Sequence, residues 1–157
     1  MKSIVIGIGN RDRGDDAVGI IVAGRLREIE ALPARVLELA GEGATLIDAW
    51  QGYDRAILVD AIRPGAKPGM EGAIHWFDGH ETVLPSGLFH YSTHAFSVAE
   101  AVEMARVLGL LPPVLLVCGV VGKSFAPGLS LSPMVEQAAR TLTADLARLL
   151  MSEHKPQ

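Results

Sequence analysis

The sequence of 157 residues has one cysteine, few aromatic residues and no long apolar run. Cys118 alone cannot form an intrachain disulfide or a structural zinc site built from several cysteines. No apolar stretch approaches the roughly 20 residues of a membrane-spanning helix, so we expect no membrane partner. The apolar residues before Gly7 lack the small-residue cleavage pattern of a signal peptide, and they predict a first strand instead.

Basic residues are also scarce, and they do not cluster. The chain has 14 lysines and arginines against 18 acidic residues, which gives a formal net charge of −4. Nucleic-acid-binding surfaces normally carry a positive patch, so this composition argues against a nucleic-acid partner. The length suits one α/β domain. We therefore expect residues 1–157 to form a single cytoplasmic domain.

The spacing of apolar residues predicts five strands and four helices in the order βαβαββαβα. Strands are expected at residues 3–9, 35–40, 55–61, 73–77 and 114–121. Helices are expected from about 15 to 30, at 45–50, from 93 or 97 to 108, and from 133 onward.

This order predicts an α/β fold, a three-layer sandwich with helices on both faces of the sheet. The five-stranded sheet should be mostly parallel, with one antiparallel strand. The connection before strand 73–77 is too short for a helical crossover, so this strand should run antiparallel to its predecessor or lie at an edge. Residues 78–93 lack periodicity, and a loop of that length is often functional.

Ligands in such sheets bind outside the carboxyl ends of the strands, where three segments should meet. The loop after the first strand carries Asp15 and Asp16, the third strand ends in Asp60, and the segment before the third helix carries His90 and His94. Asp15 is placed to cap the first helix, and Asp16 to offset its dipole. The positive end of the third helix favours a neutral His94 ring with a free lone pair.

Two of these carboxylates and one imidazole that converge on one spot would suit a metal such as nickel, zinc or manganese. The two carboxylates could instead form an acid/base pair, because neighbouring acids push their pKa values apart. Asp60 is the most informative of these candidates, since an acid at the inner end of an apolar strand is costly to bury without partners.

The other reactive side chains are not expected to take part in catalysis or metal binding. Cys118 lies among valines and leucines and is expected to be an inert core thiol. His75, in the expected edge strand, and His154, in the tail, should both be solvated. No Ser-His or Cys-His nucleophile pair is evident.

The glycine-rich opening loop, GIGNRDRGDDAVG at residues 7–19, resembles a nucleotide-binding turn only in part. A dinucleotide turn needs a third glycine where this chain has Asp12, and the next glycine comes two residues late. Asp12, Asp15 and Asp16 would also repel a pyrophosphate. Spacing and charge both argue against a Rossmann-like nucleotide site.

The same loop resembles the opening motif of the hydrogenase maturation endopeptidases, which process the large subunit of nickel-iron hydrogenases. That motif reads Gly, Ile or Val, Gly, Asn, four variable residues, Asp, Asp or Glu, two variable residues and Gly. The resemblance continues in order through ILVDAIRPGAKPG, STHAFSVAEAV and GLSLSPMVEQA. It covers roughly residues 2–150.

The resemblance implies an α/β sandwich and a nickel site formed by Asp16, Asp60 and His94. The metal would be carried by the large-subunit precursor, with Gly7 and Gly9 clearing room for its approach, and no organic cofactor is implied. The implied activity is removal of a C-terminal extension after nickel insertion. A noncatalytic chaperone that senses nickel is the alternative.

One segment departs from the family pattern. Many members have Asp-Gly-Gly-Thr after the second strand, where this chain has Glu38-Leu39-Ala40-Gly41. The loop helps the family to discriminate among target hydrogenases, so the resemblance does not name the target.

Overall fold

The structure is a computed structural model that describes all residues except 41, 66–69, 86, 90–97, 129 and 153–157. Its elements follow the predicted order, with one added 3-10 helix. They are β1 (Ser3–Ile8), η1 (Gly14–Ala17), α1 (Val18–Arg27), β2 (Arg35–Leu39), α2 (Gly43–Trp50), β3 (Arg55–Ile62), β4 (Ile74–Asp78), α3 (Val98–Leu108), β5 (Val114–Val121) and α4 (Pro133–Ser152).

The strands form one five-stranded sheet in the order β2-β1-β3-β5-β4. The first four strands in that order are parallel, and β4 pairs antiparallel with β5. The predicted fold class is therefore confirmed. The strand after the short connection lies at an edge, as one of the two expected alternatives proposed, and its partner is β5 and not the preceding β3.

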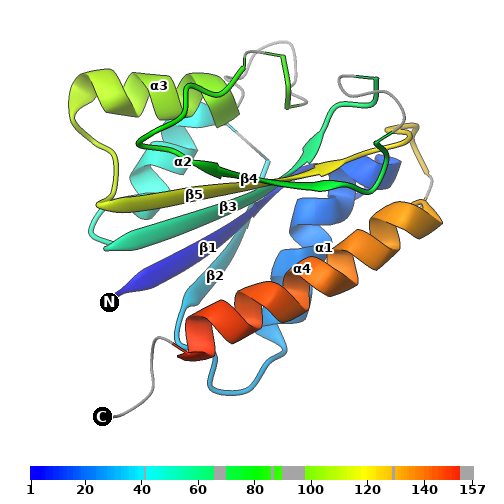
Figure 1. The fold of residues 1–157 in the computed structure, drawn as a ribbon, viewed down its shortest axis with the longest axis horizontal. Coiled ribbons are helices and arrows are strands. Elements are labelled where there is room, and N and C mark those ends of the chain that lie inside the picture. The colour runs from blue at the N-terminus through cyan, green and yellow to red at the C-terminus, as the bar shows by residue number, and fades with distance from the viewer. Residues whose placement is uncertain (41, 66–69, 86, 90–97, 129, 153–157) are drawn as a thin grey trace.

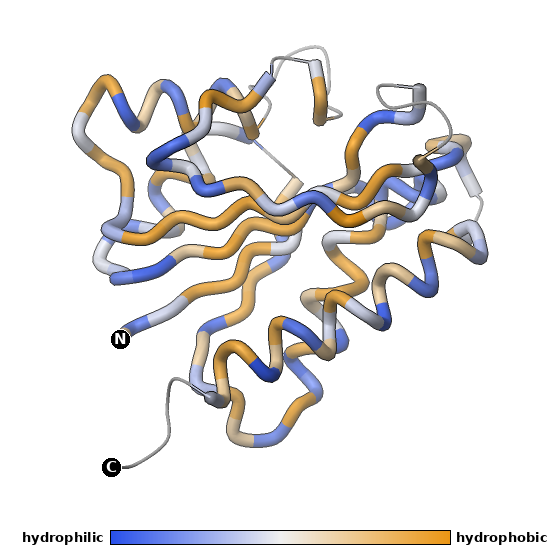
Figure 2. Tube along the Cα trace, viewed as in Figure 1, coloured by the Kyte–Doolittle hydropathy of each residue, from blue (hydrophilic) through white to orange (hydrophobic). Residues whose placement is uncertain are grey.

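Two helices cover each face of the sheet (Figure 1). Side chains of α2 and α3 pack on one face, and side chains of α1 and α4 pack on the other. Figure 2 shows the apolar strands lying between these layers. Every residue of β1 and β3 is buried, because strands covered on both faces have no solvated side.

Several element boundaries differ from the sequence prediction by a few residues. α1 ends at Arg27 and not near Glu30, because the chain tightens into a turn in which the Ile29 N–H donates to the Leu26 carbonyl at 3.0 Å. β3 continues beyond Asp60 to Ile62, so this acid lies inside the strand and does not end it. The expected start of the third helix falls outside the described residues.

No helix among the described residues is long and apolar enough to cross a membrane.

α1 approaches the sheet at backbone contact because both surfaces carry glycine. A methyl group on Gly7 of β1 would overlap the Gly19 carbonyl oxygen of α1. A methyl group on Gly19 would overlap the Val59 carbonyl oxygen of β3 and lie 2.5 Å from the Ile8 carbonyl oxygen. These separations, from 2.2 to 2.5 Å, are far below van der Waals contact. Neither glycine can therefore be replaced without moving the helix.

We expect Gly19→Ala to destabilise the fold by about 3 kcal/mol or more, because rigid backbone atoms would have to move. Gly24→Ala on the same helix is the matched control, since a methyl group there meets nothing within 4 Å. The control should gain about 0.5–1 kcal/mol from better helix propensity. Urea unfolding measures both free energies. Equal effects of the two substitutions would contradict the close packing.

Candidate active site

Two buried acids meet at the carboxyl end of the sheet. Asp60 lies near the end of β3 and is 1% exposed, and Asp16 lies in η1 and is 3% exposed. They are close enough for the negative charge of Asp16 to raise the pKa of Asp60. The structure therefore brings together two of the three predicted site residues.

Only one oxygen of the Asp60 carboxyl group is satisfied by the described residues. Its Oδ1 accepts a hydrogen bond of 2.8 Å from the Ala61 N–H. Its Oδ2 is buried and has no hydrogen-bond partner among those residues. Burial raises the pKa of Asp60 well above its usual range, and the charge of Asp16 raises it further. The site therefore favours a proton or a cation at Asp60.

A glycine places Asp16 beside the sheet. Gly9 follows β1 with φ of 151°, and a methyl group there would overlap the Asp16 carbonyl oxygen. Gly7 and Gly9 thus make room for this chain's own α1 and η1. The sequence resemblance implied that this room would serve the approach of a substrate, but the chain's own backbone occupies the space that a side chain would take at both positions.

Asp15 has a different role from the helix cap predicted from sequence. Neither η1 nor α1 has a side-chain cap hydrogen bond. The Asp15 carboxylate instead accepts from the backbone N–H groups of Lys123, Ser124 and Ser132 and from the Ser132 hydroxyl. These partners lie between β5 and the start of α4, more than a hundred residues away in sequence, where no local pattern could reveal them.

The opening loop is also tied to β2. Arg11 pairs with Glu38 at 2.5 Å, and Glu38 pairs with Arg27 of α1 at 2.6 Å. Such exposed pairs contribute about 0–1 kcal/mol each. Arg11 of the opening loop thus links the loop to β2. Its partner, Glu38, belongs to the segment in which the sequence departs from the family pattern.

The predicted third ligand cannot be placed. His94 and the neighbouring His90 lie outside the described residues, as does His154 in the tail. Within the described part of the chain, no three His, Cys, Asp or Glu side chains are grouped to hold a metal. His75 is half-buried in β4 and stacks on Phe77, so the prediction of a solvated ring is wrong. Cys118 is buried, as predicted.

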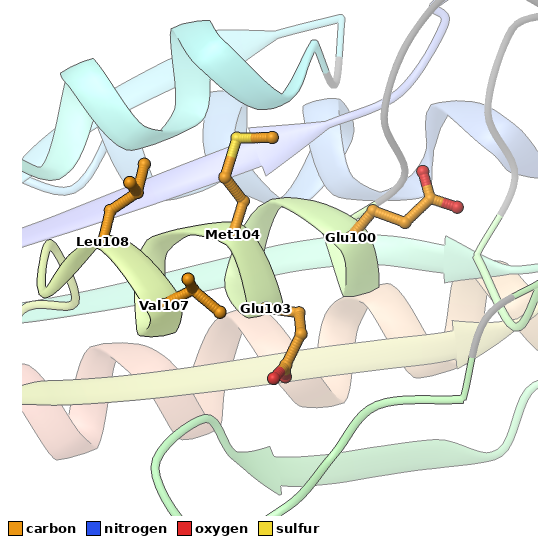
Figure 3. A pocket seen from close by; sticks show the side chains of 5 residues that line it. All are labelled: Glu100, Glu103, Met104, Val107 and Leu108. Atoms are coloured by element: carbon orange, nitrogen blue, oxygen red, sulfur yellow. The ribbon is translucent and has the colours of Figure 1, made fainter.

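A separate pocket lies on the outer side of α3 (Figure 3). All five lining residues project from this one helix, and neither acid of the site is among them. They are Glu100, Glu103, Met104, Val107 and Leu108.

The fold and the site place this protein among three-layer α/β sandwich proteins that carry a buried acid pair at the carboxyl end of the sheet. Comparison with known proteins narrows the class to a family. Residues 20–148 match the family model described as hydrogenase maturation protease. The chain therefore belongs to the hydrogenase maturation protease family, as the sequence resemblance predicted.

Individual relatives agree with this assignment. The chain is 29% identical over 140 residues to the hydrogenase 2 maturation protease of Escherichia coli strain K12, covering 87% of this chain and 82% of that protein. The solved structure of the hydrogenase maturating endopeptidase HybD from Escherichia coli superposes with a TM-score of 0.76 and 25% identity, covering 98% of this chain and 94% of the other.

A second solved structure, the NiFe hydrogenase maturation protease HycI from Thermococcus kodakarensis KOD1, shares the fold. It superposes with a TM-score of 0.69 and 24% identity, covering 96% of this chain and 92% of the other.

Asp60→Asn should flatten the pH dependence of stability. Because the folded state raises the pKa of Asp60 above its usual value of 3.8, the native protein holds a proton that the unfolded chain releases. Asp60 alone should therefore contribute a loss of about 1.4 kcal/mol per pH unit as the pH rises from 3.8 toward its raised pKa. Asparagine does not titrate, so the variant should lack this slope.

Urea unfolding between pH 4 and pH 8 measures the difference between the two slopes. Asp48→Asn, at an exposed acid of α2, is the control and should keep the wild-type slope. A wild-type slope in Asp60→Asn would show that Asp60 does not hold the proton.

Proposed function

We propose that this chain is a cytoplasmic endopeptidase that removes a C-terminal extension from a nickel-iron hydrogenase large-subunit precursor after nickel insertion. Membership of the hydrogenase maturation protease family supports the reaction class. The buried acid pair supports recognition of the nickel that the precursor carries.

Nickel recognition rests on the Asp60 oxygen that has no hydrogen-bond partner among the described residues. An acid that is 1% exposed, with one oxygen unsatisfied by the described residues, is unfavourable in its charged form. A divalent cation beside it would stabilise the charge of Asp60 and that of Asp16 together. Nickel accepts mixed nitrogen and oxygen ligands, so two carboxylates together with an imidazole form a ligand set that it can use.

The proposed ligand set is Asp16, Asp60 and His94, the last by the sequence resemblance. Two carboxylates and one imidazole leave coordination positions for ligands that belong to the precursor. In this proposal nickel is part of the substrate, and the enzyme needs no organic cofactor.

Hydrolysis of the scissile bond adds the hydroxyl of water to the carbonyl carbon and a proton to the leaving nitrogen. The water can be activated by the nickel of the precursor or by a carboxylate of the pair. In the second case a carboxylate of the pair accepts a proton from the water as the hydroxyl adds to the carbonyl carbon, and then passes that proton to the leaving nitrogen. The described residues of the site thus support either a metal-assisted or an aspartic-type reaction.

We expect cleavage of nickel-loaded precursor and no cleavage of nickel-free precursor, because ligands from both proteins are needed to hold the metal. Mass measurement of the precursor after incubation detects loss of the C-terminal extension. Equal cleavage of both forms would refute nickel recognition. Binding of the loaded form without any loss of mass would favour a noncatalytic chaperone.

The same cleavage assay, applied to variants of Asp16 and Asp60, tests the role of each acid. Asp60→Ala should lower kcat/KM at least a hundredfold, since removing groups that merely support metal ligands costs about 10–100-fold. Asp16→Glu should be tolerated better, because it keeps a carboxylate. Asp48→Ala is the control at an exposed acid and should retain full activity. Full activity of Asp60→Ala would remove Asp60 from the site.

Cys118 should take no part in the reaction. It is fully buried in β5, and burial raises the pKa of its thiol. We expect Cys118→Ala to leave cleavage intact and to cost about 1 kcal/mol of stability. Inactivation of the native wild type by an alkylating reagent that spares Cys118→Ala would contradict this expectation.

A further inference from the structure

Asp15 is an acid whose burial is fully compensated, directly beside the site. It is 0% exposed and lies next to Asp16 in η1. Its Oδ2 accepts hydrogen bonds from the Lys123 N–H at 2.8 Å, the Ser124 N–H at 3.1 Å and the Ser132 hydroxyl at 2.6 Å. Its Oδ1 accepts from the Ser132 N–H at 2.7 Å. Four donors converge on one carboxylate.

These donors join the opening loop to the segment between β5 and α4. The contact is reciprocal, because the Asp15 N–H donates to the Ser124 carbonyl at 2.9 Å. The Gly128 N–H donates to the Asp12 carbonyl at 2.9 Å. The Ser132 carbonyl in turn accepts the Glu136 N–H of α4 at 2.8 Å. Asp15 is thus linked to the first turn of α4.

The two backbones fit together with little space between them. A methyl group on Gly14 would lie 2.6 Å from the Ser124 carbonyl oxygen, and Gly14 has φ of +55°. A methyl group on Gly122 would lie 3.2 Å from the Asp15 Cβ atom. Glycine at both positions lets the opening loop and the segment after β5 approach each other closely. This close fit holds η1 against β5 and α4.

The geometry of η1 couples the positions of the Asp15 and Asp16 side chains. A 3-10 helix has three residues per turn, so consecutive side chains point about 120° apart. Asp15 therefore faces the β5–α4 segment while Asp16 faces β3. Any rotation or shift of η1 that moved the Asp15 carboxylate away from its donors would also move the Asp16 carboxylate away from Asp60.

We propose that Asp15 is a positioning residue that holds Asp16 at Asp60, and that Ser132 makes the start of α4 part of this support. The inference rests on the proposed function, in which Asp16 contacts the nickel of the precursor. Asp15 itself contacts neither metal nor peptide. Its four hydrogen bonds set the position from which Asp16 acts.

Asp15→Asn is the principal test, because the amide keeps the size of the side chain but turns an NH2 group toward N–H donors. We expect KM for nickel-loaded precursor to rise about tenfold or more, the effect typical of removing a group that orients a metal ligand. Ser132→Ala removes one of the four donors and should raise KM less. A crystal structure of Asp15→Asn should show the Asp16 carboxylate displaced from its wild-type position.

A purely structural role gives a different result. Partial unfolding lowers the concentration of active enzyme, and hence the apparent kcat, and leaves KM unchanged. Leu150→Ala, which truncates a buried side chain at the far end of α4, controls for lost stability and should keep the wild-type KM. An unchanged KM in Asp15→Asn, with Asp16 in its wild-type position, would overturn the proposal.

Two further outcomes are also decisive. If Asp15→Asn does not fold, the KM of Ser132→Ala decides, and a wild-type value there counts against the proposal. If the wild-type protein cleaves no precursor, the proposed function fails. The position of Asp16 in the crystal structure of the variant then still supports or overturns the positioning role by itself.

Discussion

The candidate site depends on the close approach of α1 to the sheet. Two glycines, Gly7 on β1 and Gly19 on α1, allow backbone to meet backbone, and Gly9 allows η1 to do the same at the end of β1. Helices and sheets separated by ordinary side chains lie farther apart. At such a separation η1 would stand away from β3, and Asp16 could not act on Asp60. The acid pair is a consequence of this packing.

Buried acids in this site have either a structural or a chemical role, depending on how completely hydrogen bonds satisfy their carboxyl groups. Asp15 is buried with four donors, which offset the loss of hydration of its charge. Asp60, whose pKa the charge of Asp16 raises, is buried with one oxygen unsatisfied by the described residues. The first arrangement stabilises the fold. The second lowers its stability whenever Asp60 is charged, and such a cost is typical of functional sites.

Local pattern was enough to predict the fold but not the contacts that build the site. The apolar runs of β1 and β3 and the helical spacing of α4 predicted the layers, and they placed most boundaries to within a few residues, because burial on both faces leaves a direct mark on sequence. The same logic found Asp60 as an acid among apolar residues. The partners of Asp15 lie 108 to 117 residues away, so its helix-start position suggested a cap instead. The glycines were visible in sequence, but only the structure shows that they face α1 and η1.

The raised pKa of Asp60 has a consequence for how the site would meet a metal. Binding of a cation to a protonated acid releases the proton, so the proton competes with the metal and weakens the affinity for free ions. In the proposed function this competition is useful, because the enzyme would not fill with ions from solution. Nickel already held by a precursor brings further ligands with it, and these can supply the binding energy that the acid pair lacks. A buried acid with a raised pKa would thus favour a metal presented by a protein over the same metal in water.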